Sequence, residues 1–338
     1  MKVGESGFNL FLIVSTTLVL LISLELFYQH NEWVFCFKNL GCSTNISKCP
    51  VGTFRIGNMI DCHDVLGCSS ITEDLIITDQ VLGEGTQKKV KKGLWQGHEV
   101  AVSFLKHLDY LEDFRHGLSM MQLFSEEPGH LENRVVQLIG WCFDKEPIIM
   151  TEIHPLGSAS RLHAVLQEHF SHQDCLKVRF RMCIEFVQIL NILHTHDMGP
   201  RVMCDANYPE KALSQFLLTK NLSLVLNDMD ALPRVDRESG QLIKCGHREL
   251  QGDFVAPEQR WNSDSEYNDT KMAHYDEKVD IWKVPDVCNF LIGDIMGASK
   301  IQLHLFNIHS RCKHTEPSKR PSAKDILAIY EQVYKRLK

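Results

Sequence analysis

The stretch LGEGTQKKV, residues 82–90, lies between two runs of residues that are typical of β-strands. Gly83 and Gly85 carry no side chain, so the backbone amides beside them can approach a phosphate group closely, and the flanking strands would fold over it as a hairpin. Two glycines in this spacing also occur in ordinary hairpin turns. The stretch is therefore a candidate phosphate-binding loop whose significance depends on the motifs that follow it.

Further signatures follow this loop in a fixed order. They are VAVS at residues 100–103, APE at residues 256–258, DIW at residues 280–282 and Arg320. In this order and at these separations the set resembles the protein kinase fold over residues 71–338. The resemblance implies an α+β, bilobal protein kinase-like fold. An N-terminal β-rich lobe with one helix would precede a C-terminal helical lobe, with a cleft between them.

The hydrophobic patterning agrees with two lobes of this kind. Short β-rich runs come first, and helical periodicity dominates the second half. We expect strands at residues 75–82, 88–94, 99–105, 135–141, 147–153, 214–218 and 222–226, and helices at residues 111–124, 178–194 and 322–337.

Both residues of the usual kinase ion pair are missing. In ordinary kinases a third-strand lysine contacts the nucleotide phosphates and pairs with a helix glutamate; here those positions are Ser103 and Gly117. One interpretation is a kinase that has lost its activity. The other is relocation to Lys88, which has the position used by the with-no-lysine kinases, and which then binds nucleotide together with Gly83 and Gly85. The simplest alternative for Lys88 is a solvated strand lysine, since further lysines follow it closely.

The catalytic loop also departs from the usual pattern. VMCD at residues 202–205 stands where His-Arg-Asp is expected, which makes Asp205 the candidate base for the substrate hydroxyl. Asn207 takes the place of the loop's usual lysine. The asparagine expected five residues after Asp205 is absent, but residues 214–218 read like the strand that normally follows it. We therefore expect an insertion that brings Gln215 to the metal-ligand position.

The acidic turn NDMD, residues 227–230, ends a strand where Asp-Phe-Gly is expected. Asp228 is then the candidate metal ligand, and Asp230 could add a second carboxylate. Mg²⁺ prefers oxygen ligands and shares them with phosphates, so Asp228 and Gln215 are chemically sufficient. The expected cofactors are ATP and Mg²⁺ or Mn²⁺. The alternative is that the two aspartates form only a polar turn.

Other residues match structural positions of the kinase fold. Glu258 and Arg320 match a buried ion pair that anchors the helical lobe, and Asp280 matches the helix aspartate that holds the catalytic loop. Cys204 replaces the arginine that receives an activation-segment phosphate in many kinases, and Cys245 lies within that segment. We predict a disulfide between these two cysteines that orders the segment without phosphorylation.

An apolar run precedes the kinase-like region. Residues 6–24 carry no charge, and as a helix they would span about 28 Å, close to the thickness of a bilayer's hydrocarbon core. A buried core helix and a cleavable signal peptide are the alternatives, but no small-residue cleavage site follows the run. We expect a short cytosolic tail at residues 1–7, a transmembrane signal anchor at 8–27, a cysteine-rich stem at 28–70 and the kinase-like domain at 71–338.

Charge and cysteine usage predict that the body lies on the luminal side of the membrane. Lys2 precedes the apolar run and Lys38 is the first basic residue after it, which favours a cytosolic N-terminus. Cysteines crowd the stem without a zinc-binding pattern, so we expect disulfides. Glycosylation sequons begin at Asn45, Asn221 and Asn268. These features predict a single-pass type II protein of the secretory pathway.

The composition limits the possible partners. The chain has 338 residues and a formal net charge of −7, which leaves room for one large two-lobed domain. A nucleic-acid partner is not expected, because such binding needs a basic surface.

Longer runs narrow the family. TEIHPLGS (151–158), RVMCD (201–205), KCGHREL (244–250) and GDFVAPEQ (252–259) are similar to the protein O-mannose kinase family. That resemblance implies ATP-dependent phosphorylation of the 6-hydroxyl of mannose in an O-linked trisaccharide, notably on α-dystroglycan, at the endoplasmic reticulum membrane. Two alternatives remain: a catalytically inactive luminal pseudokinase scaffold, and a receptor-like kinase whose kinase domain is cytosolic.

Overall fold

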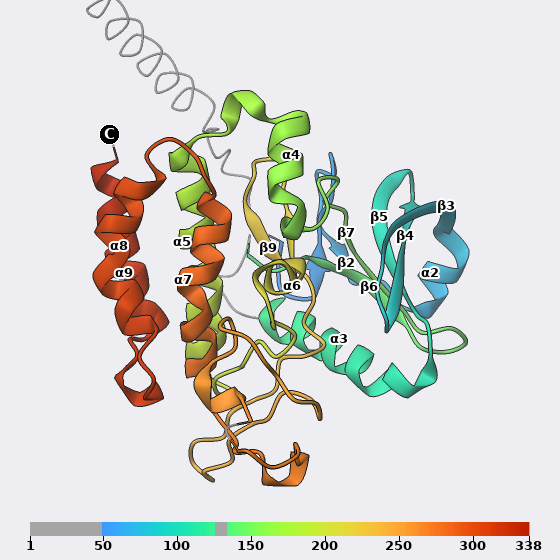
Figure 1. Ribbon diagram of the computed structural model, residues 1–338. Coiled ribbons are helices and arrows are strands. Elements are labelled where there is room, and N and C mark those ends of the chain that lie inside the picture. The colour runs from blue at the N-terminus through green and yellow to red at the C-terminus, as the bar shows by residue number, and fades with distance from the viewer. Residues whose placement is uncertain (1–48, 126–133, 262, 338) are drawn as a thin grey trace, which may run out of the picture.

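The computed structural model describes residues 49–125, 134–261 and 263–337. A β-rich lobe is followed along the chain by a larger helical lobe (Figure 1). The predicted α+β architecture with two lobes is therefore confirmed.

The small lobe is built on a five-stranded antiparallel sheet with the spatial order β3-β4-β5-β7-β6. Its strands are β3 (Leu75–Glu84), β4 (Lys88–Trp95), β5 (His98–Leu105), β6 (Leu138–Cys142) and β7 (Ile148–Glu152). Helix α3 (Leu111–Ser125) packs beside this sheet. Phe114, Leu118 and Met121 are buried on it at a spacing that forms one helical face, so the helix holds a fixed position next to the sheet.

The segment before β3 also packs on this lobe. It contains β1 (Thr53–Phe54), β2 (His63–Asp64) and α2 (Cys68–Asp74). The ring of Phe54 is fully buried and lies 5.4 Å from the Trp95 ring in β4. A Cβ at Gly140 would lie 2.7 Å from the Cβ of Leu66, so the backbones approach closely there. Residues 49–70, which the sequence places in the stem, therefore lie against the kinase sheet, while residues 28–48 lie outside the described residues.

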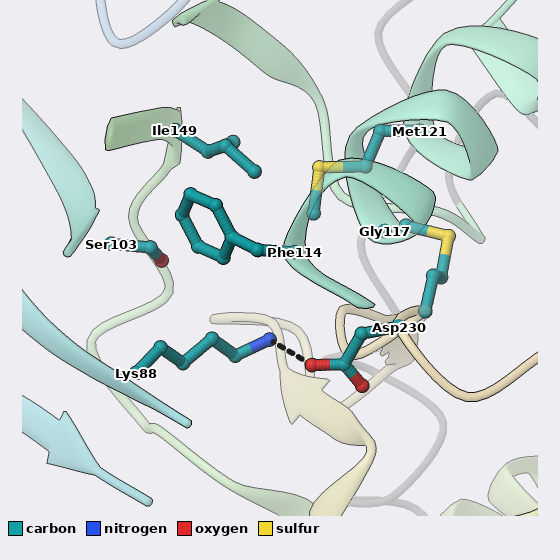
Figure 2. A pocket seen from close by; sticks show the side chains of 8 residues that line it. Lys88, Ser103, Phe114, Gly117, Met121, Ile149 and Asp230 are labelled. Atoms are coloured by element: carbon teal, nitrogen blue, oxygen red, sulfur yellow. Dashed lines mark hydrogen bonds and ion pairs between the residues drawn. The ribbon is translucent and has the colours of Figure 1, made fainter. Parts of the chain in front are cut away.

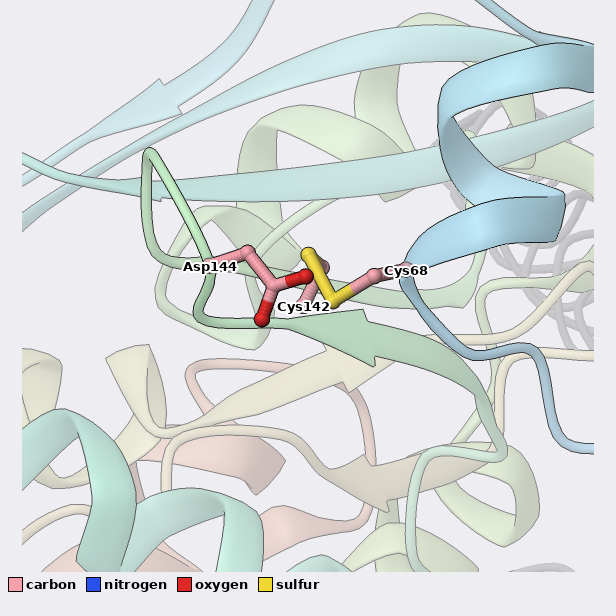
Figure 3. A group of neighbouring side chains, drawn as sticks. All are labelled: Cys68, Cys142 and Asp144. Carbon is pink, nitrogen blue, oxygen red and sulfur yellow. A yellow bond between two sulfur atoms is a disulfide. The ribbon is translucent and has the colours of Figure 1, made fainter.

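Two disulfides fasten this segment. Cys49 pairs with Cys62, and Cys68 pairs with Cys142 in strand β6. Asp144 lies beside the second disulfide (Figure 3). Because a metal-binding cysteine must be a free thiolate, these three residues do not form a metal site while the disulfide is intact. The prediction that the early cysteines form disulfides is confirmed for the three that the structure describes.

The helical lobe is assembled around one central helix. Its α-helices are α4 (Leu162–His169), α5 (Leu176–Thr195), α6 (Pro209–Ser214), α7 (Lys278–Ile292), α8 (Ala298–Cys312) and α9 (Ala323–Arg336), and its short strands are β8 (Phe216–Leu218) and β9 (Leu224–Leu226). One single-turn 3-10 helix, η1 (Leu108–Tyr110), precedes α3 in the small lobe. The others follow strand β7: η2 (Ala159–Arg161), η3 (Ser171–Gln173), η4 (Pro257–Gln259), η5 (Asp269–Lys271) and η6 (Pro317–Lys319). Helix α5 buries residues on nearly every face and packs against both α7 and α9, as a core helix does.

The expected helices and strands are all present. Their ends shift by a few residues, as element ends usually do; the helix expected at residues 322–337 spans Ala323–Arg336. Its start is fixed by a capping box in which Ser322 accepts from the Asp325 amide and Asp325 accepts from the Ser322 amide. In the part of the chain that the structure describes, no helix has the length and apolarity to cross a membrane. The predicted anchor at residues 8–27 lies outside that part.

Candidate active site

A small pocket lies where strands β4, β5 and β7, helix α3 and the acidic turn after β9 meet. Lys88, Ser103, Phe114, Gly117, Met121, Ile149, Met229 and Asp230 line it. Figure 2 shows the side chain of Lys88 extending toward Asp230 across this pocket. The pocket therefore joins the phosphate loop region to the turn that the sequence proposes as the metal site.

Sheet register explains how Lys88 comes to occupy the place of the missing lysine. Lys88 is paired with Leu105, and Val90 is paired with Ser103, across β4 and β5. Lys88 and Ser103 are therefore diagonal neighbours on one face of the sheet, because side chains alternate between faces along a strand. The side-chain ammonium of Lys88 therefore reaches the region that the ammonium of a lysine at position 103 would reach.

Lys88 is held by two carboxylates of the acidic turn. Its Nζ atom lies 2.7 Å from Oδ1 of Asp228 and 3.3 Å from Oδ2 of Asp230. The side chains of Lys88 and Asp230 are only 19% and 9% exposed. The alternative of a solvated strand lysine does not describe this arrangement.

The pKa shifts follow from burial and from this contact. Burial acts to lower the pKa of Lys88, but the charges of Asp228 and Asp230 outweigh it and hold the pKa above its usual value. Burial acts to raise the pKa of Asp228, but the charge of Lys88 and hydrogen bonds from Asp230 and Lys88 together offset it, so that this pKa is lowered. For Asp230, burial dominates and raises the pKa to about 7, because Lys88 compensates only in part and Asp228 adds repulsion. Asp228 is thus the more strongly ionised of the two.

Gly117 leaves room for the acidic turn. A Cβ built on Gly117 would lie 3.5 Å from the backbone nitrogen, Cα and Cβ of Asp230. A glutamate at this position would bring its carboxylate against that of Asp230. The two departures from the kinase pattern, Ser103 and Gly117, therefore belong together: the lysine has moved along the sheet, and its acidic partners come from the turn after β9 instead of helix α3.

Asp205 lies in the loop between α5 and α6 and is 34% exposed. The Met203 amide, two residues earlier, donates to the buried Asp280 carboxylate over 3.0 Å, and His194 lies 3.2 Å from the same oxygen. The predicted Cys204–Cys245 disulfide is present beside Asp205. These contacts hold the loop on both sides of Asp205, so the candidate base has a defined position.

Gln215 and Asp228 lie next to each other. The backbone carbonyl of Gln215 accepts from the amides of Asn227 and Asp228, over 2.9 and 3.1 Å. The Gln215 side-chain nitrogen donates to the carbonyl of Lys211 and to Ser214 Oγ, both over 3.1 Å, so its metal-binding atom would be the amide oxygen. The inserted residues of the catalytic loop form helix α6, and Gln215 follows its last residue.

The phosphate loop is the tip of the β3–β4 hairpin. Gly83 is paired with Val90, and the Gly85 amide donates to the Lys88 carbonyl over 2.9 Å. A Cβ on Gly83 would meet nothing within 4 Å, and one on Gly85 only the Lys88 carbonyl at 3.9 Å. Neither glycine is required by the packing of the hairpin, so the space beside both backbones is open to an approaching ligand.

The predicted structural ion pair is also formed. Arg320 donates to both oxygens of Glu258, over 2.5 and 2.7 Å, and the guanidinium is inaccessible to solvent. Buried charges of this kind are tolerated only when paired. The pair joins the end of the activation segment to the start of α9.

These residues fit a nucleotide and a divalent metal. Asp228, Asp230 and the amide of Gln215 offer the hard oxygen ligands that Mg²⁺ prefers, and Lys88 offers a cation to phosphate oxygens. One contact of a candidate site residue was missed by sequence reasoning: Nζ of Lys211 lies 2.5 Å from Oδ2 of Asp205. A lysine in the expected insertion is the only sequence signal for it, and only the helical turn of α6 decides that it reaches the candidate base.

Comparison with known proteins agrees with this site. Residues 76–283 match the family of protein tyrosine and serine/threonine kinases. The chain is 45% identical over 295 residues to the protein O-mannose kinase of Homo sapiens, which covers 86% of this chain and 82% of that protein. It is also 45% identical over 293 residues to the Macaca fascicularis protein of that name, covering 86% and 81% of the two chains. The Xenopus laevis protein O-mannose kinase is 40% identical over 329 residues, covering 96% and 88%. A kinase domain and relatives that align along most of their length place this chain in the protein kinase superfamily, as a member of the protein O-mannose kinase family.

Proposed function

We propose that this protein transfers the terminal phosphoryl group of ATP to the 6-hydroxyl of an O-linked mannose in a protein-attached trisaccharide. The shared name of its relatives, protein O-mannose kinase, supports mannose as the acceptor. The observation that favours an active enzyme over a pseudokinase scaffold is the contact of Lys88 with Asp228 and Asp230. It restores the charges that are missing at Ser103 and Gly117.

The site residues divide into a nucleotide set and a metal set. ATP, bound with Mg²⁺ or Mn²⁺, would supply the phosphoryl group and a metal charge that offsets the phosphates. Gly83 and Gly85 would present backbone amides to those phosphates, and Lys88 would present its ammonium. Gln215 and Asp228 would hold the metal through oxygen atoms.

Asp205 has the role of base. Its carboxylate accepts the proton of the acceptor hydroxyl and orients that hydroxyl for in-line attack. Phosphoryl transfer asks little covalent chemistry of a protein, so correct positioning and charge stabilisation provide most of the rate enhancement. The fixed loop around Asp205 and the rigid pair of Lys88 with the acidic turn meet those two needs.

We further propose that the protein is a type II membrane protein of the endoplasmic reticulum, anchored by residues 8–27, and that its natural acceptor is the glycan of α-dystroglycan. Disulfides such as Cys204–Cys245 support an oxidising compartment. The sequon asparagines Asn221 and Asn268 are both exposed, as glycosylation in the lumen would require.

A transfer assay tests the proposed reaction. Full-length protein in detergent is incubated with ATP, Mg²⁺ or Mn²⁺, and an O-mannosyl trisaccharide, with free mannose and a peptide as comparison acceptors. We expect one phosphate on the mannose 6-position of the trisaccharide, detected by mass spectrometry and NMR. Absence of transfer with every metal, from protein that still binds nucleotide, would support the scaffold alternative.

Membrane orientation has a separate test. In cells, glycosidase treatment should increase the electrophoretic mobility of the wild-type protein, and Asn221→Gln together with Asn268→Gln should reduce that shift. A protein with no glycosidase-sensitive shift would favour the receptor-like arrangement with a cytosolic kinase domain.

A further inference from the structure

We propose that Lys211 is a further catalytic residue, whose ammonium contacts an oxygen of the phosphoryl group while it passes from ATP to the acceptor hydroxyl. The proposal rests on the proposed function and deepens it. In the catalytic loop, the place of the usual lysine is taken by Asn207, whose neutral amide cannot supply a positive charge. Lys211, on the inserted helix α6, supplies it.

The first support is the position of the ammonium. Nζ of Lys211 lies 2.5 Å from Oδ2 of Asp205. A base must lie within hydrogen-bond reach of the hydroxyl whose proton it accepts, and that hydroxyl must lie within about 3–3.5 Å of the phosphorus that it attacks. An ammonium bound to the carboxylate of Asp205 is therefore beside the group in transit. The side chains of Lys211 and Asp205 are 35% and 34% exposed, so a ligand can reach them.

The second support is the link from Lys211 to the metal side of the site. The Lys211 carbonyl accepts from Gln215 Nε2 over 3.1 Å and from Ser214 Oγ over 2.7 Å. Gln215 in turn accepts from the Asp228 amide. One turn of helix thus fixes the backbone of Lys211 relative to the proposed metal ligands.

The chemical step gives this ammonium a defined task. The acceptor oxygen forms a bond to the terminal phosphorus as the bond from that phosphorus to the bridging oxygen breaks, and the electron pair of the broken bond leaves with ADP. The hydroxyl proton passes to Asp205, and Lys211 keeps its three protons throughout. Because protonation neutralises Asp205, the remaining anionic partner of Lys211 is the phosphoryl group, on whose equatorial oxygens the charge is spread. A contact that strengthens in this way raises the rate of the chemical step.

A simple surface ion pair is the competing explanation. Such pairs between partly exposed side chains contribute little to stability, and removal of the lysine would then change neither the rate nor the binding of a transition-state analogue. The two explanations therefore differ in a measurable way.

The test compares Lys211→Met and Lys211→Arg with wild type in the full-length protein. Lys220→Met, which changes an exposed lysine on the turn between β8 and β9, is the matched control. Two quantities are measured: kcat and KM for transfer to the trisaccharide, and the affinity for ADP–Mg²⁺ with and without aluminium fluoride, in the absence of any sugar. Aluminium fluoride with ADP imitates the phosphoryl group in transit, so it probes the proposed contact directly.

We expect Lys211→Met to lower kcat by roughly 10²–10³-fold, the usual effect of removing one charge-stabilising donor. The affinity for ADP–Mg²⁺ should stay as in wild type, while the gain in affinity on adding aluminium fluoride should be lost. Lys211→Arg should recover part of both properties, and Lys220→Met should match wild type. Melting temperatures of all variants show whether each has folded, and the conservative arginine variant provides a second reading if Lys211→Met is unstable.

An unchanged kcat together with an unchanged aluminium fluoride effect in Lys211→Met would overturn the proposal. A rise in KM for the sugar alone would also overturn it, since that result assigns Lys211 to acceptor binding. Failure of the wild-type protein to phosphorylate the trisaccharide would instead refute the proposed function. The sugar-free aluminium fluoride comparison would still decide the role of Lys211 in that case.

Discussion

Nζ of Lys88, at the start of strand β4, lies 2.7 Å from Oδ1 of Asp228, a residue 140 positions later in the chain. This single contact joins the phosphate loop of the small lobe to the acidic turn of the helical lobe. Because both side chains are largely buried, the pair is shielded from solvent and from salt. A nucleotide that binds beside this pair would meet a cation and a carboxylate already held in position.

Replacement of Lys88 tests the relocated lysine. Lys88→Ala should weaken ATP binding or lower kcat by roughly 10²-fold or more, because it removes the cation offered to the phosphates. Lys89→Ala, which removes the neighbouring lysine that pairs with Glu84 on the surface, and Ser103→Ala should have small effects. Isothermal titration with ATP–Mg²⁺ and steady-state kinetics measure these quantities. Equal losses in Lys88→Ala and Ser103→Ala would contradict the assignment.

Replacement of Asp205 tests the base. Asp205→Asn keeps the size of the side chain but removes its ability to accept a proton at neutral pH, so transfer should be abolished. Nucleotide affinity should remain near the wild-type value, because Lys88 and the acidic turn are untouched. Turnover at the wild-type rate in this variant would refute the assignment.

Gly117 should tolerate alanine but not glutamate. An alanine Cβ would sit at ordinary contact distance, 3.5 Å, from Asp230, and alanine in place of glycine within a helix stabilises it by roughly 0.5–1 kcal/mol. Gly117→Ala should therefore raise the melting temperature and leave activity intact. Gly117→Glu adds a carboxylate beside Asp230 and competes for Lys88, so ATP–Mg²⁺ affinity should fall. Wild-type affinity in Gly117→Glu would show that the glycine is not needed for the acidic turn.

The Cys204–Cys245 disulfide should stabilise both the fold and the catalytic loop. The bond joins residues 41 positions apart, a separation for which loop-closure entropy predicts about 3–4 kcal/mol. The Cys204→Ser, Cys245→Ser double variant should lose that much unfolding free energy in denaturant titration, and its kcat should fall because Cys204 adjoins Asp205. As a control, Cys49→Ser with Cys62→Ser removes a bond far from the loop in sequence, so it should lower stability and retain kcat. Peptide mapping without reductant that finds both thiols free would exclude the bond.

The loop that follows the APE motif, where Asp269 contacts Lys244 of the activation segment, should show an acid-dependent contribution to stability. Hydrogen bonds from Lys244, then His247 and Tyr267, lower the pKa of Asp269 to about 2 from its ordinary value of 3.8. Since the folded-state pKa is the lower one, this contribution is fully present above about pH 4 and is lost as the pH falls toward 2. Asp269→Asn should therefore melt below wild type at pH 6, with a difference that shrinks on acidification. Asp264→Asn, at an exposed position in the same loop after the APE motif, should match wild type at every pH, and a constant difference for Asp269→Asn would refute the assignment.

The chain order of the signatures was enough to predict the two lobes. Motifs such as APE and DIW keep their order in the kinase fold, because each belongs to a particular helix or loop, and the observed elements agree with the expected ones. The substitutions at Ser103 and Cys204 were informative for the same reason, since each marks a position whose usual partner is known. They led to Lys88 and to the Cys204–Cys245 disulfide. The structure confirms the disulfide, and it shows Lys88 in contact with Asp228, which the sequence did not predict.

Side-chain reach was not predictable in the same way. Lys211 is an ordinary lysine in the sequence, and it meets Asp205 only because the insertion winds into helix α6. The packing of residues 49–70 on the sheet was missed as well, because those residues have no strong period and depend on distant partners such as Trp95 and Gly140. Contacts between residues far apart in the chain follow from packing, which local patterns do not record.

The sequence by itself determined the kinase-like fold, the loss of the usual ion pair and the residues proposed to replace it, because spacing and residue type are local properties. Tertiary structure alone decided which charges meet. Strand register places Lys88 beside Ser103, the lack of a long side chain at Gly117 leaves room for Asp230, and one turn of helix carries Lys211 to Asp205. Interactions between charges weaken with distance, and in physiological salt exposed charges are largely screened beyond about 8–10 Å, so the chemistry of this site depends on distances that only the folded chain defines.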